Sequence, residues 1–259
     1  MKRSCRLLAP ACLAAAAAIL TPVAEPLRGD DSPDIVTRHA VCRRAATPPV
    51  LDGKLDDPCW KQAVPIEKFA SFWDKTPREG TRVYLAWDDE ALYWAGTMTD
   101  AEVRAFGNKR NDHLWNGDVL EFFLKPSAER PEYFEFQGNP NAAVFELAFP
   151  KPGHGLKDTH DGPALGTAVA ATVDGTLDHP GDADRGWTLE GRIPWTAFAS
   201  AGGRPRPGDT WKFAVCRYDY GPDGTKPVLM SSAPLSQPSF HRHGDYGSLT
   251  FEGPRAAGK

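Results

Sequence analysis

The sequence has little helical character and none of the short motifs that mark the common enzyme classes. Beyond the first 24 residues, no window of about a dozen residues keeps a helical period without Gly or Pro. There is no G-x-S-x-G nucleophile elbow, no H-E-x-x-H, no glycine-rich phosphate loop and no paired C-x-x-C. These absences exclude a mainly helical fold and leave these catalytic and nucleotide-binding classes without support.

The chain also lacks a basic excess, with 30 Lys and Arg against 34 Asp and Glu. The basic start at Lys2, Arg3 and Arg6 precedes an apolar stretch over residues 7–20. This stretch is too short to span a bilayer and is typical of a secretory signal peptide. Without residues 1–24, 27 basic residues face 34 acidic ones, a net charge near −7. We therefore expect a secreted or periplasmic protein that binds neither nucleic acid nor a membrane.

Cysteine is scarce once the signal peptide is set aside. Only Cys42, Cys59 and Cys216 remain. An odd number allows at most one disulfide within the chain, and an oxidising compartment would favour it. Three buried thiols are an equally good interpretation, and the sequence leaves the choice open.

Short segments of alternating hydrophobicity fill the rest of the chain. Two of them flank three acidic residues in TRVYLAWDDEALYWAGTMTD (residues 81–100), which predicts a hairpin. Repeated short strands with Gly and Pro turns predict an all-β fold, an antiparallel two-sheet β-sandwich. The expected division is a signal peptide over 1–24, a linker over 25–34, one domain over 35–253 and a tail over 254–259. Further strands are expected at residues 35–43, 133–137, 143–149, 166–174, 186–194, 210–220 and 246–251, and helical turns only at 58–63 and 195–199.

The segment LWNGDVLEFFL places a tryptophan six residues ahead of a carboxylate. Leu120, Phe122 and Leu124 alternate as a core face, so Glu121 lies on the other face. A carboxylate on a partly apolar face needs hydrogen-bonding partners, which a protein side chain or a sugar hydroxyl can supply. In YFEFQ, Phe134 and Phe136 alternate as the core face against Tyr133, Glu135 and Gln137, and in AVFELAF, Phe145, Leu147 and Phe149 alternate as the core face against Val144, Glu146 and Ala148. If these two strands lie alongside, they extend the polar face with Glu135, Gln137 and Glu146.

Aromatic residues are plentiful, with eight Trp, thirteen Phe and six Tyr. The phases of Trp87, Trp94, Trp187 and Trp211 assign them to the core. Sugar sites combine aromatic rings with carboxylates and amides, because rings stack on C–H faces and polar groups pair with hydroxyls. Carboxylates suited to a structural calcium occur at Asp112, Asp118 and the pair Asp56 and Asp57, although each is also a common turn residue. His241 and His243 lack a third metal ligand nearby and are expected in a polar loop.

Seven segments in order resemble the family 9 carbohydrate-binding modules and their secreted bacterial relatives. They are DGKLDDPCW, TRVYLAWDDEALYWAGTMTD, LWNGDVLEFFLKP, YFEFQGNP, GWTLEGRIPWTAF, PGDTWKFAVCRYDY and FHRHGDYGSLTF, and they cover roughly residues 36–252. The resemblance implies a DOMON-like β-sandwich, usually with structural calcium. It also implies binding of glucose- or xylose-based saccharides, often at chain ends, between two aromatic rings.

The resemblance also implies the site residues. The ring that precedes the strand carboxylate by six residues is Trp115, with Glu121 as the carboxylate. The second ring, shortly before the last strand, is Phe240, where the family usually has Trp. Polar contacts are expected from Gln237 and Arg217, with Lys226 as a basic contact from the following loop. Gln137 joins this set from the polar sheet face.

Three functions are compatible with the sequence. The first is a secreted, non-catalytic saccharide-binding module that supports polysaccharide breakdown, with a separately encoded glycoside hydrolase as a partner. The second is a b-type haem domain, because DOMON-like sandwiches also hold haem through Met and His or Lys. Met98 and Met230 are the candidate ligands, although their phases favour packing. The third is a glycoside hydrolase that uses Glu121 and a second carboxylate.

Overall fold

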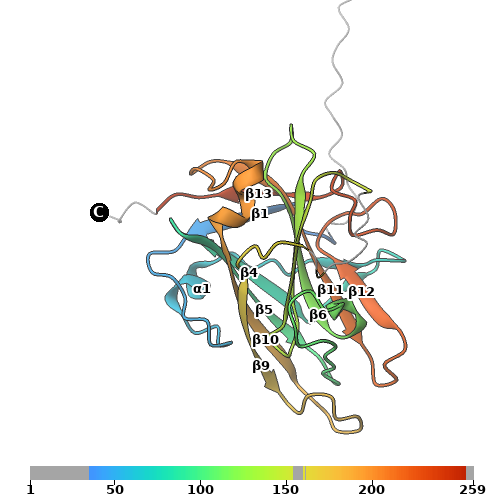
Figure 1. Ribbon diagram of the computed structural model, residues 1–259. Coiled ribbons are helices and arrows are strands. Elements are labelled where there is room, and N and C mark those ends of the chain that lie inside the picture. The colour runs from blue at the N-terminus through green and yellow to red at the C-terminus, as the bar shows by residue number, and fades with distance from the viewer. Residues whose placement is uncertain (1–34, 154–159, 161, 255–259) are drawn as a thin grey trace, which may run out of the picture. The chain divides into compact units, whose positions relative to one another are not determined.

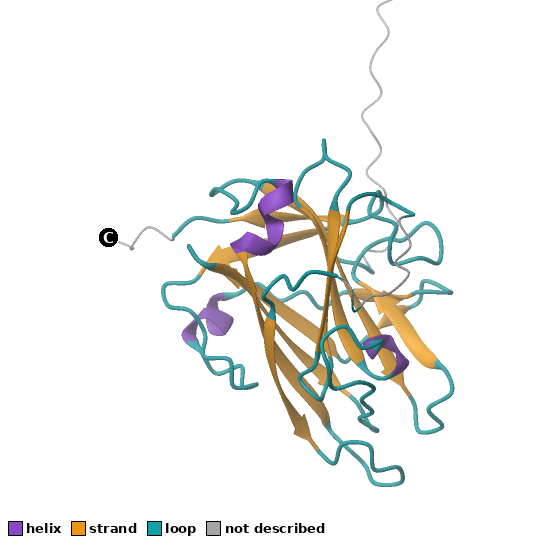
Figure 2. Cartoon of the chain, in the orientation of Figure 1, coloured by secondary structure: helices purple, strands orange, loops and turns teal. Residues whose placement is uncertain are grey.

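The computed structural model describes residues 35–153, 160 and 162–254. Strands dominate this part of the chain, with three short helical segments (Figure 2). The expected signal peptide, the linker and most of the tail lie outside the described residues. Within them, no helix is long and apolar enough to cross a membrane.

Most of the thirteen strands lie at the alternating segments where strands were expected. Pro58 at the first helical position starts the single α-helix, as predicted, and the predicted turn after Pro194 is a 3-10 helix. Strands β2, β3 and β12 were not expected, because they are short and carry little alternation. The elements are β1 (His39–Arg44), α1 (Pro58–Gln62), β2 (Phe69–Ser71), β3 (Pro77–Arg78), β4 (Thr81–Trp87), β5 (Ala91–Thr99), η1 (Leu114–Asn116), β6 (Val119–Lys125), β7 (Tyr133–Gly138), β8 (Val144–Phe149), β9 (Ala168–Asp174), β10 (Gly186–Pro194), η2 (Trp195–Ala201), β11 (Thr210–Tyr220), β12 (Pro227–Ser231) and β13 (Gly247–Phe251).

Two sheets face each other, and β1 takes part in both (Figure 1). One sheet continues from β1 through β4, β5, β10 and β9. The other continues from β1 through β13 to β11. At β11 this sheet branches: β12, β2 and β3 follow on one side, and β6, β7 and β8 follow on the other. The all-β sandwich is thus confirmed. The purely antiparallel arrangement is wrong in one place, because β1 runs parallel to both β13 and β4.

Strand β11 is the centre of the second sheet. It pairs with β6 from Lys212 to Tyr218 along one edge. Along its other edge it pairs first with β13 and then with β12. Strand β11 is eleven residues long, so the two short strands β13 and β12 fit end to end along the same edge. The site described below lies on this strand and its neighbours β6 and β7.

The core between the sheets is aromatic and aliphatic, as the alternation predicts. Leu120, Phe122 and Leu124 of β6 face Trp94 and the other large side chains of the opposite sheet. The ring of Phe122 lies 4.6 Å from that of Trp94. The four tryptophans assigned to packing are all buried, which confirms that assignment.

The segment DGKLDDPCW packs against the outer face of the first sheet. The buried carboxylate of Glu190 in β10 accepts hydrogen bonds from the Trp60 indole at 2.7 Å and from the backbone N–H of Gly53 at 2.9 Å. Gly53 has φ of +80°, and a Cβ there would lie 2.8 Å from the backbone of Ala171. The close approach therefore requires glycine at this position.

The three cysteines in the described part of the chain are free, and all are buried. The structure therefore decides between the two open interpretations in favour of buried thiols. Cys42 is in the core between the sheets, whereas Cys216 lies on the outer face of β11.

Candidate functional site

A pocket of about 680 Å³ opens on the outer face of the second sheet, opposite the sandwich core. This volume is in the range of small-molecule sites. Alternate residues of β6 and β7 form the floor, because neighbouring side chains of a strand point to opposite faces. The lining residues are Phe72, Trp115, Glu121, Phe123, Tyr133, Glu135, Phe145, Phe149, Gly153, Tyr218, Ser239, Phe240 and His241.

Aromatic rings form most of the wall. Trp115 belongs to the 3-10 turn η1 just before β6, and its half-buried indole meets the edge of Phe145 at 5.3 Å. His113 stacks against the same indole at 4.5 Å, which fixes the ring orientation. Across the pocket, Phe240 packs edge-on against Phe72 at 4.7 Å. The site therefore presents several ring surfaces of the kind that stack on sugar C–H groups.

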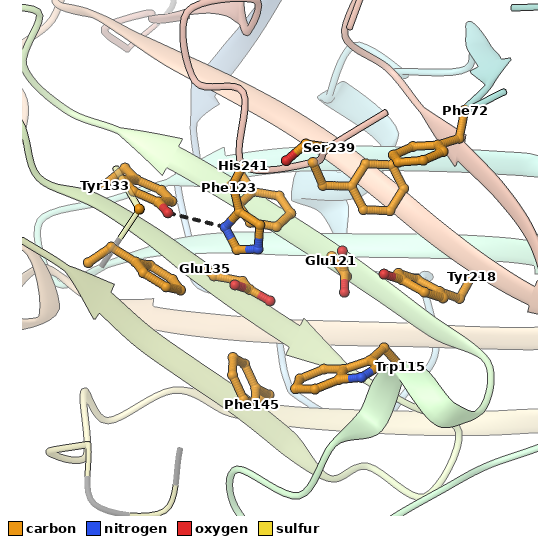
Figure 3. A pocket seen from close by; sticks show the side chains of 13 residues that line it. Phe72, Trp115, Glu121, Phe123, Tyr133, Glu135, Phe145, Tyr218, Ser239 and His241 are labelled. Carbon is orange, nitrogen blue, oxygen red and sulfur yellow. Dashed lines mark hydrogen bonds between the residues drawn. The ribbon is translucent and has the colours of Figure 1, made fainter. Parts of the chain in front are cut away.

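Two carboxylates lie among these rings. Figure 3 shows Glu121 and Glu135 between Trp115 and Phe145 on one side and Phe123 and His241 on the other. Gln137 lies directly opposite Glu121 on the neighbouring strand, and its Nε2 donates a 2.5 Å hydrogen bond to Glu135 Oε1. Both Glu121 Oε2 and Gln137 Oε1 are buried without a hydrogen-bond partner among the described residues. Such orphan acceptors are costly unless a ligand or water satisfies them.

Burial raises the pKa of both carboxylates, and charge repulsion adds to the effect at Glu121. The pKa of Glu121 is raised well above its usual range, first by burial and then by the nearby charge of Glu135. Burial raises the pKa of Glu135 to about 7, against the opposing effect of the Gln137 hydrogen bond. The pair therefore holds a proton near neutral pH and can both donate and accept hydrogen bonds.

Three of the predicted site residues come together in this pocket, namely Trp115, Glu121 and Phe240. Gln137 lies beside them, hydrogen-bonded to Glu135. Lys226 and Gln237 are exposed on loops and do not line the pocket. Gln237 instead accepts a 3.2 Å hydrogen bond from Arg242.

Arg217 does not lie at the pocket, so its expected place there is wrong. It is paired in register with Leu120, and the two side chains share the inner face of the sheet. Its guanidinium donates to Asp100 Oδ2 at 3.1 Å and to the Thr99 carbonyl at 3.0 Å, and it is fully buried. The neighbouring residues Cys216 and Tyr218 have the outward phase, and Tyr218 is the one that lines the pocket.

Arg217 belongs to a cluster with three carboxylates. Oxygen atoms of Asp100, Asp118 and Asp219 all lie within 4.8 Å of one another. Arg217 Nη2 is 3.1 Å from Asp100 and 3.4 Å from Asp219, so one cation pairs with two of the three acids, and Asp118 accepts hydrogen bonds from the backbone N–H groups of Arg104 and Tyr220 at 2.7 Å each. Burial, together with the charge of Asp100, raises the pKa of Asp118 to about 8.

The oxygen donors of this cluster suit a hard cation such as calcium, and these residues would hold it. The structural calcium implied by the resemblance stays a prediction. Of the residues considered for it, only Asp118 belongs to the cluster. Asp112 accepts hydrogen bonds from the backbone of Asn108 and Lys109, and Asp57 accepts one from Val50, which are turn roles.

Glu146 was expected on the polar face with Glu121, and this is wrong. In the register of β7 and β8, Glu146 is opposite Phe136, which faces the core, whereas Phe145 is opposite Gln137. The alternation of AVFELAF was correct, but its apolar side is the outer face. Glu146 is satisfied there by backbone N–H groups of Leu165 and Thr167, each at 2.9 Å.

Several pocket residues were not predicted. Phe145 and Phe149 were assigned to the core, and Tyr133 was placed on the outer face without a role. Phe72, Tyr218 and His241 come from three separate parts of the chain. His241 Nδ1 lies 3.1 Å from the Tyr133 hydroxyl, so the histidine expected in a polar loop is part of the pocket mouth. The outward phase of Tyr133 beside Glu135 was the one signal available in the sequence.

Neither methionine is placed to bind haem. Met98 and Met230 are both buried in the core between the sheets, and Met230 Sδ accepts a 3.5 Å contact from the Thr81 hydroxyl. Haem would need a large apolar slot beside one of them. The structure therefore favours the packing interpretation.

Comparison with known proteins gives consistent results. Residues 51–254 match the family described as carbohydrate family 9 binding domain-like. Over 88 residues, 34% of this chain, the sequence is 30% identical to endo-1,4-beta-xylanase A of Thermotoga neapolitana, and the match covers 8% of that protein's length.

Among solved structures, a family 9 carbohydrate binding module from Caldicellulosiruptor kristjanssonii in complex with cellotriose superposes with a TM-score of 0.59. The sequences are 16% identical, and the match covers 84% of this chain and 95% of that one. The same type of module in complex with glucose gives a TM-score of 0.56 at 15% identity over 85% and 98% of the two chains. These TM-scores show a shared fold. The family match over residues 51–254 shows that this chain belongs to the carbohydrate family 9 binding domain-like family.

Proposed function

We propose that this protein is an exported, non-catalytic module that binds the end of a glucose- or xylose-based saccharide in the pocket formed by Trp115, Glu121 and Phe240. The observation that carries the proposal is the combination of aromatic walls with buried carboxylate and amide oxygens that have no partner among the described residues. Sugar hydroxyls can donate the hydrogen bonds that these oxygens lack, and the C–H faces of a sugar can stack on the aromatic rings.

The glycosidase alternative receives less support. A glycosidase needs two carboxylates placed on either side of a bond, with water reaching one of them. Glu121 and Glu135 instead lie on the same face of adjacent strands at the pocket floor, and both are buried. The family and its cellotriose- and glucose-bound members also support a binding role. Binding near a chain end would help a separately encoded glycoside hydrolase to reach its polymer.

Calorimetric titration with glucose, xylose and cellotriose tests the proposal. The matched variants are Trp115→Ala, at the pocket, and Phe106→Ala, an aromatic residue that is 48% exposed and does not line the pocket. Trp115→Ala should weaken binding by at least about tenfold, since one ring stacked on a sugar contributes on the order of 1 kcal/mol beyond its buried area. Phe106→Ala should bind like the parent. Equal affinity in all three proteins would place the site elsewhere.

Two further measurements address the finer parts of the proposal. If the pocket holds one terminal sugar, glucose and cellotriose should bind with affinities within about threefold, because the extra units add few contacts. A much tighter cellotriose complex would show that the binding surface extends along the chain. Export is tested by sequencing the amino terminus of the protein recovered from outside the cytoplasm, with a start near residue 25 expected.

A further inference from the structure

The pocket floor has an excess of carboxylates and of hydrogen-bond acceptors. Glu121 is 2% exposed and Glu135 is 5% exposed, and they lie diagonally across β6 and β7 on the same face. Glu121 Oε2 and Gln137 Oε1 have no partner among the described residues. The pocket floor therefore has several hydrogen-bond acceptors and few donors to pair with them.

The side chains that line the pocket supply no cation in the part of the chain that the structure describes. None of them is Lys or Arg, and burial lowers the pKa of His241, the one basic side chain among them, which favours its neutral form. The nearest lysine along the same face of β6 is Lys125, whose ammonium donates to the backbone carbonyls of Ser127 and Arg130 instead. Around the two carboxylates, the titratable groups are Cys216 and Tyr218 of β11, Tyr133 of β7, Tyr246 before β13, and His241 at the pocket mouth. The thiol and the phenols are neutral when protonated, and the lowered pKa of the buried His241 favours its neutral form.

The aromatic walls favour the same kind of ligand. A ring face carries partial negative charge and attracts a cation, most strongly where water is excluded. Trp115 and Phe145 border the carboxylates on one side and Phe123 on the other (Figure 3). A protonated amine is the group that combines a positive charge with three donors and no acceptor. It complements both the rings and the unpaired oxygens.

We infer that the preferred ligand of this pocket is a saccharide whose terminal unit carries a free, protonated amine, as glucosamine does. The inference rests on the proposed function, because it assigns the ligand class of the same site. The ammonium lies against Glu121 and Glu135, and the sugar ring lies against Trp115. A neutral sugar leaves a proton on the carboxylate pair, whereas the ammonium allows both carboxylates to ionise, and the proton leaves to the buffer.

The test is calorimetric titration of the full protein with glucosamine, N-acetylglucosamine and glucose at a slightly acidic pH, in two buffers of different ionisation enthalpy. Glucosamine should bind at least about tenfold more tightly than glucose, since a charged hydrogen bond in a dry site is worth about a factor of ten or more. Its apparent enthalpy should depend on the buffer, which reports proton release, and that of glucose should not. N-acetylglucosamine, which keeps the nitrogen but not the charge, should lose the advantage.

Glu121→Gln provides the internal control, because it keeps the side-chain shape and removes the charge. This variant should bring glucosamine to within about threefold of glucose and abolish the proton release. Comparable binding of glucose and glucosamine by the parent protein would overturn the inference and leave the proposed function standing. No binding of any of these sugars or of cellotriose would overturn both.

Discussion

The two faces of strands β6, β7 and β11 are equally buried but chemically different. The inner face carries Leu120, Phe122 and Phe136 and packs against the opposite sheet. The outer face alternates aromatic rings with Glu121, Glu135 and Gln137 and lies beneath loops that leave a pocket open. Burial is therefore a poor guide to function in this sheet. What distinguishes the functional face is that a buried acceptor without a partner among the described residues, Glu121 Oε2, borders an open pocket where a ligand can reach it.

Arg217 is the one cation on the inner face of β11, and its removal should have the largest effect on stability. Arg217→Ala leaves Asp100 without its guanidinium partner, and loss of one member of a buried ion pair costs about 3–5 kcal/mol. Urea denaturation measures this loss. Arg82→Ala, which removes an exposed pair with Glu67, is the matched control and should change little. Wild-type stability in Arg217→Ala would contradict the structural role.

Phe122 and Phe123 allow the two faces to be compared with one substitution. Phe122→Ala opens a cavity in the closed core and should lower the free energy of unfolding by about 3–5 kcal/mol. Phe123→Ala should cost about half as much, because water can enter from the adjacent pocket, but it should weaken saccharide binding. Equal losses of stability, with unchanged affinity in Phe123→Ala, would show that the outer face is merely a second core.

The carboxylates of the outer face should make stability depend on pH. The pKa values of Glu121 and Glu135 are raised on folding, so the folded protein holds more protons than the unfolded chain between the ordinary glutamate pKa and about 7. Stability should therefore fall as pH rises through this interval. Glu121→Gln should reduce the slope and stabilise the protein by about 1–3 kcal/mol above neutral pH. Denaturation midpoints at several pH values give the slope, and a steeper slope in the variant would be inconsistent with this explanation.

Calcium at Asp100, Asp118 and Asp219 should have the smallest effect. Free calcium at about five times its dissociation constant would stabilise the fold by about 1 kcal/mol, and a chelator would reverse it. Thermal unfolding with and without calcium measures the change, and Asp118→Asn should remove it. A melting temperature insensitive to calcium and chelator would mean that Arg217 alone neutralises the cluster.

The sequence was most informative where a strand's own alternation decides the answer. The alternation correctly placed Leu120, Phe122 and Phe134 in the core. The Trp115 ring and the Glu121 carboxylate, which the sequence places six residues apart, line the same pocket. Alternation does not show which of a strand's two faces points toward the core, however, and the two faces of AVFELAF were assigned the wrong way round. Two apolar faces exist in this sheet, so hydrophobicity could not choose between them.

Residues on loops were the least predictable. Gln237 and Lys226 are close in sequence to pocket elements but project elsewhere, whereas Phe72 and His241 reach the pocket from distant segments. Loop direction depends on turn geometry and on contacts across the fold, which local pattern does not encode. The parallel pairing of β1 with β13 and β4 has the same origin, because it joins strands far apart in the chain.

The sequence by itself determined that this protein is a strand-rich sandwich with a carboxylate on a partly apolar face, since side-chain alternation has a period of two wherever a strand forms. Only the tertiary structure decided which carboxylates meet, that Arg217 pairs with Asp100 instead of lining the pocket, and that Glu121 Oε2 has no hydrogen-bond partner among the described residues. These are properties of register and of contacts between separate segments. They arise only when the strands are paired and the loops have closed over the sheet.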